Sequence, residues 1–181
     1  MDDYPTIAVD DCPVPFSVLA ARLEGALAGE GWGQPVHDFR LGSFEVAFKN
    51  VERRLILEIV ERPGRPVRCD LACEDVPWSV LIIGPTAGQL GAATSAATAE
   101  SADTEADLVV SLRVAGWGVD LRPDRPDRCP WATRADGRRY VAKVPGRTVG
   151  RVSEWYVQGD GLDASASGAT PYAVVAALAL S

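Results

Sequence analysis

Hydrophobic and polar positions along this chain form two units of the same design, each a helical stretch that ends at a Gly-Trp-Gly tripeptide. In the first unit, Leu23 and Leu27 precede Gly31-Trp32-Gly33. The second unit has the same residue types at the same offsets, namely Leu108, Leu112 and Gly116-Trp117-Gly118. Leucines four residues apart share one face of a helix, and glycine commonly follows its last turn. The pattern therefore predicts two equivalent units in which a helix leads into a strand.

Alternating apolar residues after the first unit predict an antiparallel meander of three or four strands. Residues 36–48 are expected to form two strands that bend at Gly42-Ser43. Residues 55–60 are apolar on both faces, which is typical of a central strand. After a turn rich in proline, arginine and glycine at 62–66, the remaining strands are expected at 67–72 and 80–83.

The second half is expected to contain a helix, further strands and a terminal helix. Thr104 and Asp107 form a pair typical of a helix N-cap. A doubled Arg-Pro-Asp unit at 122–130 predicts an extended connecting arm. Asp136-Gly137 predicts the turn of a hairpin, and Pro171 is expected to begin the last helix. The hairpin and its neighbours are expected to supply strands at 119–121, 139–144 and 148–158.

Two segments lack the bulky apolar residues of a regular core element. Residues 86–103 are dominated by Ala, Ser and Thr, and they predict a weak helix with a frayed end. Residues 159–168 are small and polar, and they predict a loop.

This order of elements predicts a two-layer α+β fold, a mostly antiparallel sheet with packed helices. We expect residues 1–181 to form a single domain, with pseudo-duplicated halves at 16–85 and 104–181 joined by the segment 86–103. In architecture this is similar to small bacterial chaperone-like and immunity-type folds, although no motif identifies a family.

Composition is typical of a cytosolic protein that does not bind nucleic acid. The 181 residues are 47% hydrophobic, enough for a core without disulfides or a structural metal. The net charge is −7, with 19 acidic and 9 basic side chains in residues 1–121, which disfavours binding to a polyphosphate backbone. The acidic start at Met1-Asp2-Asp3 is unlike a signal peptide, and the longest apolar run, 172–180, is too short to span a membrane.

The candidate chemistry is sparse. His37 is the only histidine, so any Ser-His or Cys-His scheme must use it, and no phosphate loop, nucleophile elbow or dinucleotide fingerprint accompanies it. The four cysteines are expected to be buried thiols, with a four-thiolate zinc site as the alternative: Cys12, Cys69, Cys73 and Cys129. Carboxylate clusters at 70–75 and 100–107 have no calcium-loop spacing. We therefore expect no catalytic residues, no cofactor and no metal.

One basic and aromatic region is the candidate partner-binding surface, because arginine and aromatic side chains carry much of the energy of protein interfaces. It comprises Trp131, Arg134, Arg138, Arg139, Tyr140, Arg147, Arg151 and Trp155. The plain alternative is that alternate residues such as Tyr140, Ala142 and Val144 face the core and leave the arginines solvated.

The leading hypothesis for function is a non-enzymatic cytosolic protein that holds a protein partner on its sheet face or on the basic hairpin. A secretion chaperone, an immunity factor or a phage-encoded inhibitor would act in this way. The second hypothesis is a ligand-binding or hydrolytic domain whose pocket lies between the halves and is lined by Asp70, Glu74, His37 and arginines. A third is an assembly or virion subunit, and a homodimer is an alternative to a different protein partner.

Overall fold

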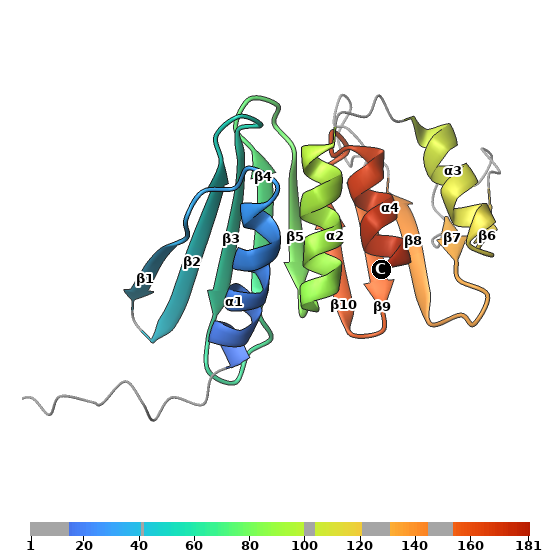
Figure 1. Cartoon of the computed structure of the whole chain (residues 1–181). Helices are drawn as coiled ribbons and strands as arrows, with labels where there is room; N and C mark the ends of the chain where they lie inside the picture. The colour runs from blue at the N-terminus through green and yellow to red at the C-terminus, as the bar shows by residue number, and fades with distance from the viewer. Residues whose placement is uncertain (1–14, 41, 100–103, 121–130, 145–153) are drawn as a thin grey trace, which may run out of the picture.

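A computed structural model describes residues 15–40, 42–99, 104–120, 131–144 and 154–181. Within these residues, four helices pack on one face of a single ten-stranded antiparallel sheet, which confirms the predicted α+β class (Figure 1). The helices are α1 (Pro15–Ala28), α2 (Ala87–Thr98), α3 (Glu105–Val114) and α4 (Tyr172–Leu180). No helix in the described ranges is both long enough and apolar enough to cross a membrane.

The ten strands form two meanders that meet in the middle of the sheet. The first meander consists of β1 (Val36–Arg40), β2 (Ser43–Asn50), β3 (Leu55–Glu61), β4 (Arg68–Cys73) and β5 (Ser79–Ile83). The second consists of β6 (Gly118–Val119), β7 (Ala132–Thr133), β8 (Arg139–Val144), β9 (Glu154–Gly159) and β10 (Leu162–Ala166). Across the sheet the order is β1-β2-β3-β4-β5-β10-β9-β8-β7-β6. We call the central junction between β5 and β10 the seam; that the two meanders are duplicated halves of one domain stays a prediction.

The two Gly-Trp-Gly tripeptides have matching local structures. Gly31 and Gly116 adopt φ values of +80° and +82°, a conformation that glycine reaches without strain. The backbone N–H of Trp32 donates to the carbonyl of Leu27 at 3.3 Å, and that of Trp117 donates to the carbonyl of Leu112 at 2.9 Å. Both tryptophan side chains are buried. Helices α1 and α3 therefore end in the same way, in a turn after which a tryptophan side chain packs in the core.

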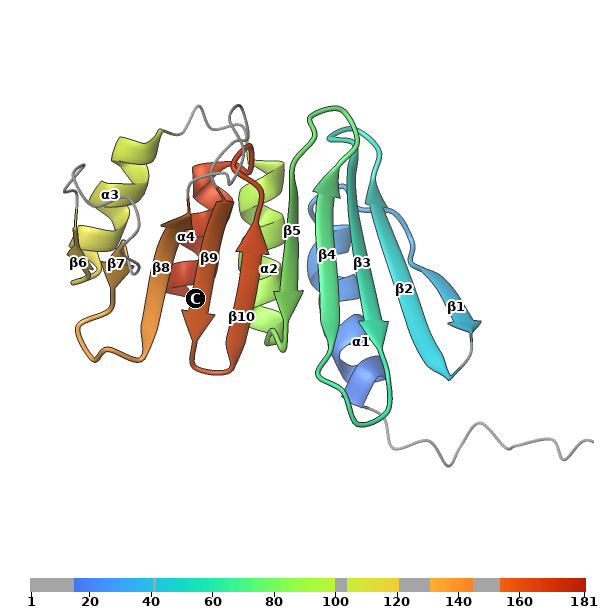
Figure 2. The same cartoon turned by 180° about the vertical axis from the view of Figure 1, so that it is seen from behind.

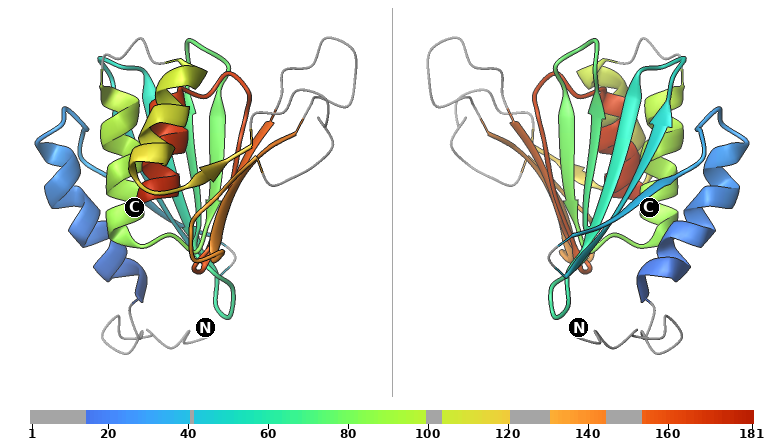
Figure 3. Two further views of the ribbon diagram at one scale, coloured as in Figure 1. Left: turned by 90° about the vertical axis from the view of Figure 1, so that its right-hand side faces the viewer. Right: turned by 90° about the vertical axis from the view of Figure 1, so that its left-hand side faces the viewer.

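The core lies between the helices and the face of the sheet that they cover. Alternate residues of β3, Leu55, Leu57 and Ile59, point into this layer and are buried. Helix α4 contributes Val174 and Leu178, also fully buried. Figure 3 shows all four helices on the same side of the twisted sheet. The other side of the sheet carries no helix from the described part of the chain, and we call it the open face (Figure 2).

Three local predictions are wrong and one is confirmed. Residues 159–168 were expected to be a loop, yet β10 lies there and pairs with both β5 and β9, because two neighbours compensate for a weak intrinsic strand preference. The chain at 55–60 was expected to be buried on both faces, but Ile56 and Val60 are only half-buried on the open face. Tyr140 and Val144 do not face the helices; their neighbours Arg139 and Val141 do. Helix α2 confirms the helix expected in 86–103, with a capping box between Thr86 and Gln89.

Several predicted features fall outside the described residues. These are the extended arm at 122–130, the frayed end at 100–103 and the part of the hairpin at 145–153.

Candidate functional site

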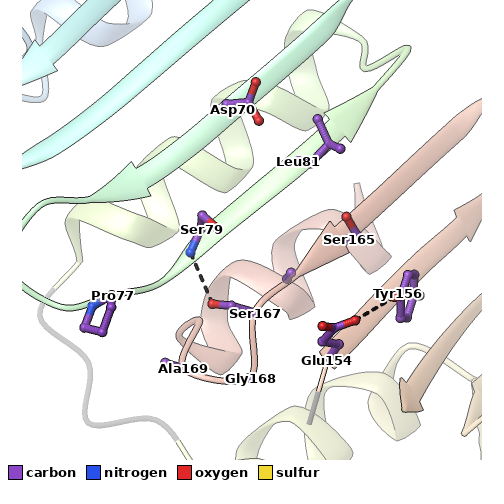
Figure 4. A pocket seen from close by; sticks show the side chains of 11 residues that line it. Asp70, Pro77, Ser79, Leu81, Glu154, Tyr156, Ser165, Ser167, Gly168 and Ala169 are labelled. Carbon is purple, nitrogen blue, oxygen red and sulfur yellow. Dashed lines mark hydrogen bonds between the residues drawn. The ribbon is translucent and has the colours of Figure 1, made fainter. Parts of the chain in front are cut away.

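The open face contains a hollow of about 400 Å³ at the seam, where the two meanders meet. We call it the seam hollow. Figure 4 shows that its lining comes from β4, β5, β9, β10 and the turn that follows β10. Its polar side chains are two carboxylates, three serine hydroxyls and one phenol, from Asp70, Glu154, Ser79, Ser165, Ser167 and Tyr156. Leu81 supplies an apolar surface among them.

A small hydrogen-bond network ties the two meanders together at one end of the seam hollow. The Oγ of Ser167 accepts from the backbone N–H of Ser79 at 3.2 Å and lies 3.2 Å from Oγ1 of Thr170. Thr170, which is buried, donates in turn to the carbonyl of Ser79 at 3.3 Å. Buried or half-buried polar groups that are hydrogen-bonded in this way hold one geometry. The edge of the hollow is therefore a fixed part of the fold.

The two carboxylates of the hollow differ in their neighbours. Arg68 donates to Asp70 through Nε at 2.9 Å and through Nη2 at 3.3 Å, and the hydrogen bond and charge of Asp70 raise the pKa of the Arg68 guanidinium. Glu154 accepts a hydrogen bond of 2.7 Å from the phenol of Tyr156. Asp70 thus has a cationic partner at 2.9 Å, whereas the described partner of Glu154 is a neutral phenol. The side chains that line the hollow in the described ranges include no basic one.

The structure does not bring the single histidine to the seam hollow. His37 is exposed on β1, four strands from β5, which corresponds to roughly 19 Å at the usual spacing between strands. Glu74 follows β4, where its backbone N–H donates to the carbonyl of Arg54, and it does not line the hollow. Of the residues that the second hypothesis placed in one pocket, the structure brings only Asp70 to the hollow. A serine hydroxyl there has no imidazole within reach to activate it.

The predicted partner-binding residues do not form one surface, because two of them lie beneath the helices. Arg139 is only 3% exposed, and its Nη1 donates to the carbonyls of Leu178 at 3.4 Å and Ala179 at 3.1 Å, as well as to that of Ser181. A cation at this position also complements the negative end of α4. Trp155 is 1% exposed and makes edge-to-face contacts with Trp131 and Tyr172, with ring centroids 5.2 and 5.8 Å apart.

The other predicted residues are scattered. Arg134 forms ion pairs with Asp136 at 2.7 Å and Asp160 at 2.5 Å, and it holds the pKa of Asp136 down at about 2. Arg138 is exposed at the same turn. Tyr140 lies on the open face, where its hydroxyl donates to Gln158. Arg147 and Arg151 lie outside the described residues.

The described cysteines lie on β4. Cys69 is fully buried on the helix-covered face, and burial raises the pKa of its thiol to about 12, so the thiol is protonated at neutral pH and is a weak nucleophile. Cys73 is half-buried. Cys12 and Cys129 lie outside the described residues, so the structure places only two of the four proposed zinc ligands.

Comparison of the chain with protein-family models, with curated proteins and with solved structures returns no match. Functional inference therefore rests on the geometry of the two faces. The sequence did contain one signal for the open face. In β3, the helix-facing residues Leu55, Leu57 and Ile59 are all aliphatic, whereas the alternate set includes the charged Glu58.

Proposed function

We propose that this protein is a non-enzymatic, cytosolic protein-binding module that holds a partner on the open face, in the manner of a chaperone-like or immunity-type protein. The observation that carries the proposal is the open face itself. Ten strands form a broad surface of which, in the described ranges, one side is packed under helices and the other is not. An antiparallel sheet commonly leaves one face to water, and that face is then polar, so aliphatic residues on the open face depart from the usual pattern.

Aliphatic side chains gather on the open face of the first meander. Ile56 and Val60 of β3 and Leu81 and Ile83 of β5 are all half-buried without a covering helix, and β4 lies between these strands. In register, Val60 lies opposite Arg68, which in turn lies opposite Ile83. Half-buried aliphatic side chains on both sides of the charged side chains of β4 offer a partner both apolar and polar contacts, the mixture found at protein interaction sites.

The open face supports this proposal better than the basic hairpin does. The hairpin surface depended on Arg139 and Trp155, and both side chains pack under helices, where a partner could reach them only if α4 moved away. The described remainder of the predicted surface is divided between an ion-paired turn around Arg134 and the open-face residue Tyr140.

Site-specific photo-crosslinking tests the proposal. A benzophenone amino acid replaces Ile83 on the open face in one variant and Val110, an aliphatic residue 59% exposed on α3, in the matched control. Illumination in lysate of the source cells is expected to attach one defined protein, identified by mass spectrometry, to the Ile83 variant and not to the Val110 variant. Equal capture from both positions, or none from Ile83, contradicts the proposal.

A second candidate function, binding of a small polar ligand, is favoured by the seam hollow. Its volume is more than ten times the roughly 30 Å³ that one water molecule occupies in the liquid, and its carboxylates and hydroxyls offer several hydrogen bonds. A thermal-shift screen of small polar compounds tests this, with Ser165→Leu as a variant that fills the hollow. A compound that raises the midpoint of the natural protein and not that of the variant would favour this second function.

A further inference from the structure

Pairs of like charges face each other across the strands of the open face. Glu58 of β3 lies directly opposite Asp70 of β4, and Asp38 of β1 lies directly opposite Glu45 of β2. Directly opposed residues in an antiparallel sheet have Cβ atoms about 4.5–5.5 Å apart, and like charges there are destabilising. Both pairs lie on the same face, because each alternates with residues that point toward the helices.

One basic side chain compensates the Glu58–Asp70 pair only in part. Arg68 is bonded to Asp70 and also feels the charge of Glu58, so one guanidinium serves two carboxylates. On the open face of β2 to β5 and β8 to β10, the described side chains include five acidic and two basic ones. The acidic residues are Glu45, Glu58, Asp70, Glu154 and Asp163, and the basic ones are Lys49 and Arg68.

The carboxylates of Glu58 and Asp70 lie among the aliphatic side chains of β3 and β5, and Asp70 reaches the seam hollow. Asp70 belongs both to the Glu58–Asp70 pair and to the lining of the seam hollow, where Glu154 adds a second carboxylate. Leu81, opposite Asp70, offers an apolar wall. Lysine and arginine pack their methylene stems on apolar surface and keep the charged head near carboxylates, so the hollow fits such a side chain.

We propose that the partner on the open face is a protein segment that presents both aliphatic and cationic side chains on one side, at positions i and i+2 of an extended stretch. Its lysine or arginine side chains neutralise the Glu58–Asp70 pair, and one of them enters the seam hollow between Asp70 and Glu154. Its aliphatic residues pack on Ile56, Val60 and Ile83. This inference rests on the proposed function, because it names the chemistry of the partner that the open face would hold.

A pair of designed peptides tests the charge of the partner. A fluorescent peptide in which every second residue is alternately leucine or lysine, with serine between them, is titrated with the full chain; we call it the Leu-Lys peptide. The Leu-Glu peptide, with glutamate in place of each lysine, is the matched probe of opposite charge. The Leu-Lys peptide is expected to bind, and about tenfold more weakly when ionic strength rises from roughly 0.05 to 0.5 M, because salt screens exposed charges. The Leu-Glu peptide is expected not to bind. Equal binding of the two peptides, or none of the Leu-Lys peptide, overturns the inference.

Charge-removing variants locate the binding. The double variant Glu58→Gln with Asp70→Asn is expected to bind the Leu-Lys peptide about tenfold more weakly. Glu24→Gln, which removes the same type of charge from the exposed side of α1, is expected to change the affinity less than twofold. Circular dichroism and the unfolding midpoint verify that each variant is folded. A similar loss in both variants would mean a nonspecific attraction to net charge, which overturns the inference.

The crosslinking result separates this inference from the proposed function. If Ile83 captures a protein that lacks a cationic segment, or a second copy of this chain, the open face is an interface and the cationic partner is wrong. If Ile83 captures nothing while the Leu-Lys peptide binds and the double variant weakens that binding about tenfold, the proposed natural partner fails in the cell tested but the chemical preference of the face stands.

Discussion

The two faces of the ten-stranded sheet are built from alternate residues of the same strands, yet they differ in burial and in charge. On the helix-covered face, Leu57 and Ile59 are fully buried, and the core consists of aliphatic and aromatic side chains. On the open face, the neighbours Glu58 and Val60 remain in reach of water, and Glu58 directly faces Asp70. The first face is organised for packing. The second face retains directly opposed like charges, which lower the stability of the fold. Such an arrangement is typical of a surface whose residues serve binding rather than stability.

The largest expected effect sharpens this contrast within one strand. Leu57→Ala removes a side chain that is 0% exposed and leaves a cavity under the helices, so it is expected to lower the free energy of unfolding by about 3 kcal/mol. Ile56→Ala, one residue away on the open face, is expected to cost roughly 1 kcal/mol or less, because that side chain is only half-buried. Urea denaturation measures both. Equal losses would mean that the open face is packed as tightly as the covered one.

The next prediction compares two adjacent arginines of the same turn. Arg139→Ala removes a buried cation that bonds to carbonyls at the end of α4, and it is expected to cost about 2 kcal/mol. Arg138→Ala, at an exposed position, is expected to change stability by less than about 0.5 kcal/mol. If urea denaturation showed a larger loss of stability for Arg138→Ala than for Arg139→Ala, Arg139 would not anchor α4. The prediction that Arg139 is a surface residue would then be favoured again.

A pH-dependent prediction concerns the one described carboxylate of β3 that points toward the helix-covered side. One oxygen of Glu61 is buried without a hydrogen-bond partner among the described residues, and burial raises its pKa above the ordinary 4.5. A buried carboxylate is harder to ionise in the folded protein than in the unfolded chain. The loss of folding stability caused by its ionisation is therefore absent below pH about 4 and complete above the raised pKa. Glu61→Gln is therefore expected to raise the unfolding midpoint at pH 7 and to leave it unchanged near pH 3. A variant that is less stable at pH 7 would contradict the raised pKa.

The smallest expected effect is a gain in stability on removal of a charge. Glu58→Gln relieves repulsion with Asp70 across the strands and is expected to stabilise the free protein by a few tenths of a kcal/mol. The same change weakens the proposed binding of a cationic segment. Thermal unfolding in the absence of any peptide measures the first effect. A clear loss of stability would show that Glu58 is held by attraction to Arg68 more than it is repelled by Asp70.

Local features of the fold could be predicted where a short pattern decided them. The two Gly-Trp-Gly turns, the N-cap at Thr104, the helix at 86–103 and most strands of the first meander follow from spacing and turn residues. Strand β10 was missed because its small polar residues have a weak strand preference, although Asp160-Gly161 before it is a hairpin turn signal of the same kind as Asp136-Gly137. Its pairing with β5, which is far away in the chain, had no local signal.

The candidate site was predictable only in part, for a related reason. Asp70 was among the expected pocket residues, and a position between the halves was expected for the pocket. The serines of β5 and β10, however, meet only because the two meanders join at the seam, and a sequence carries no direct signal of which strands become neighbours. Arg139 was assigned to the surface because arginine usually lies there, and its burial depends on the end of α4 lying next to β8.

By itself, the sequence determined where helices end, where the first strands turn and which residues alternate, because these depend on backbone preferences and on contacts between near neighbours. Only the tertiary structure decided that the meanders meet at β5 and β10, that all four described helices lie on one face, and that Glu58 and Asp70 stand opposite each other on the face left open. Those relations join residues far apart in the chain, and they are selected by burial of the common core rather than by any local pattern.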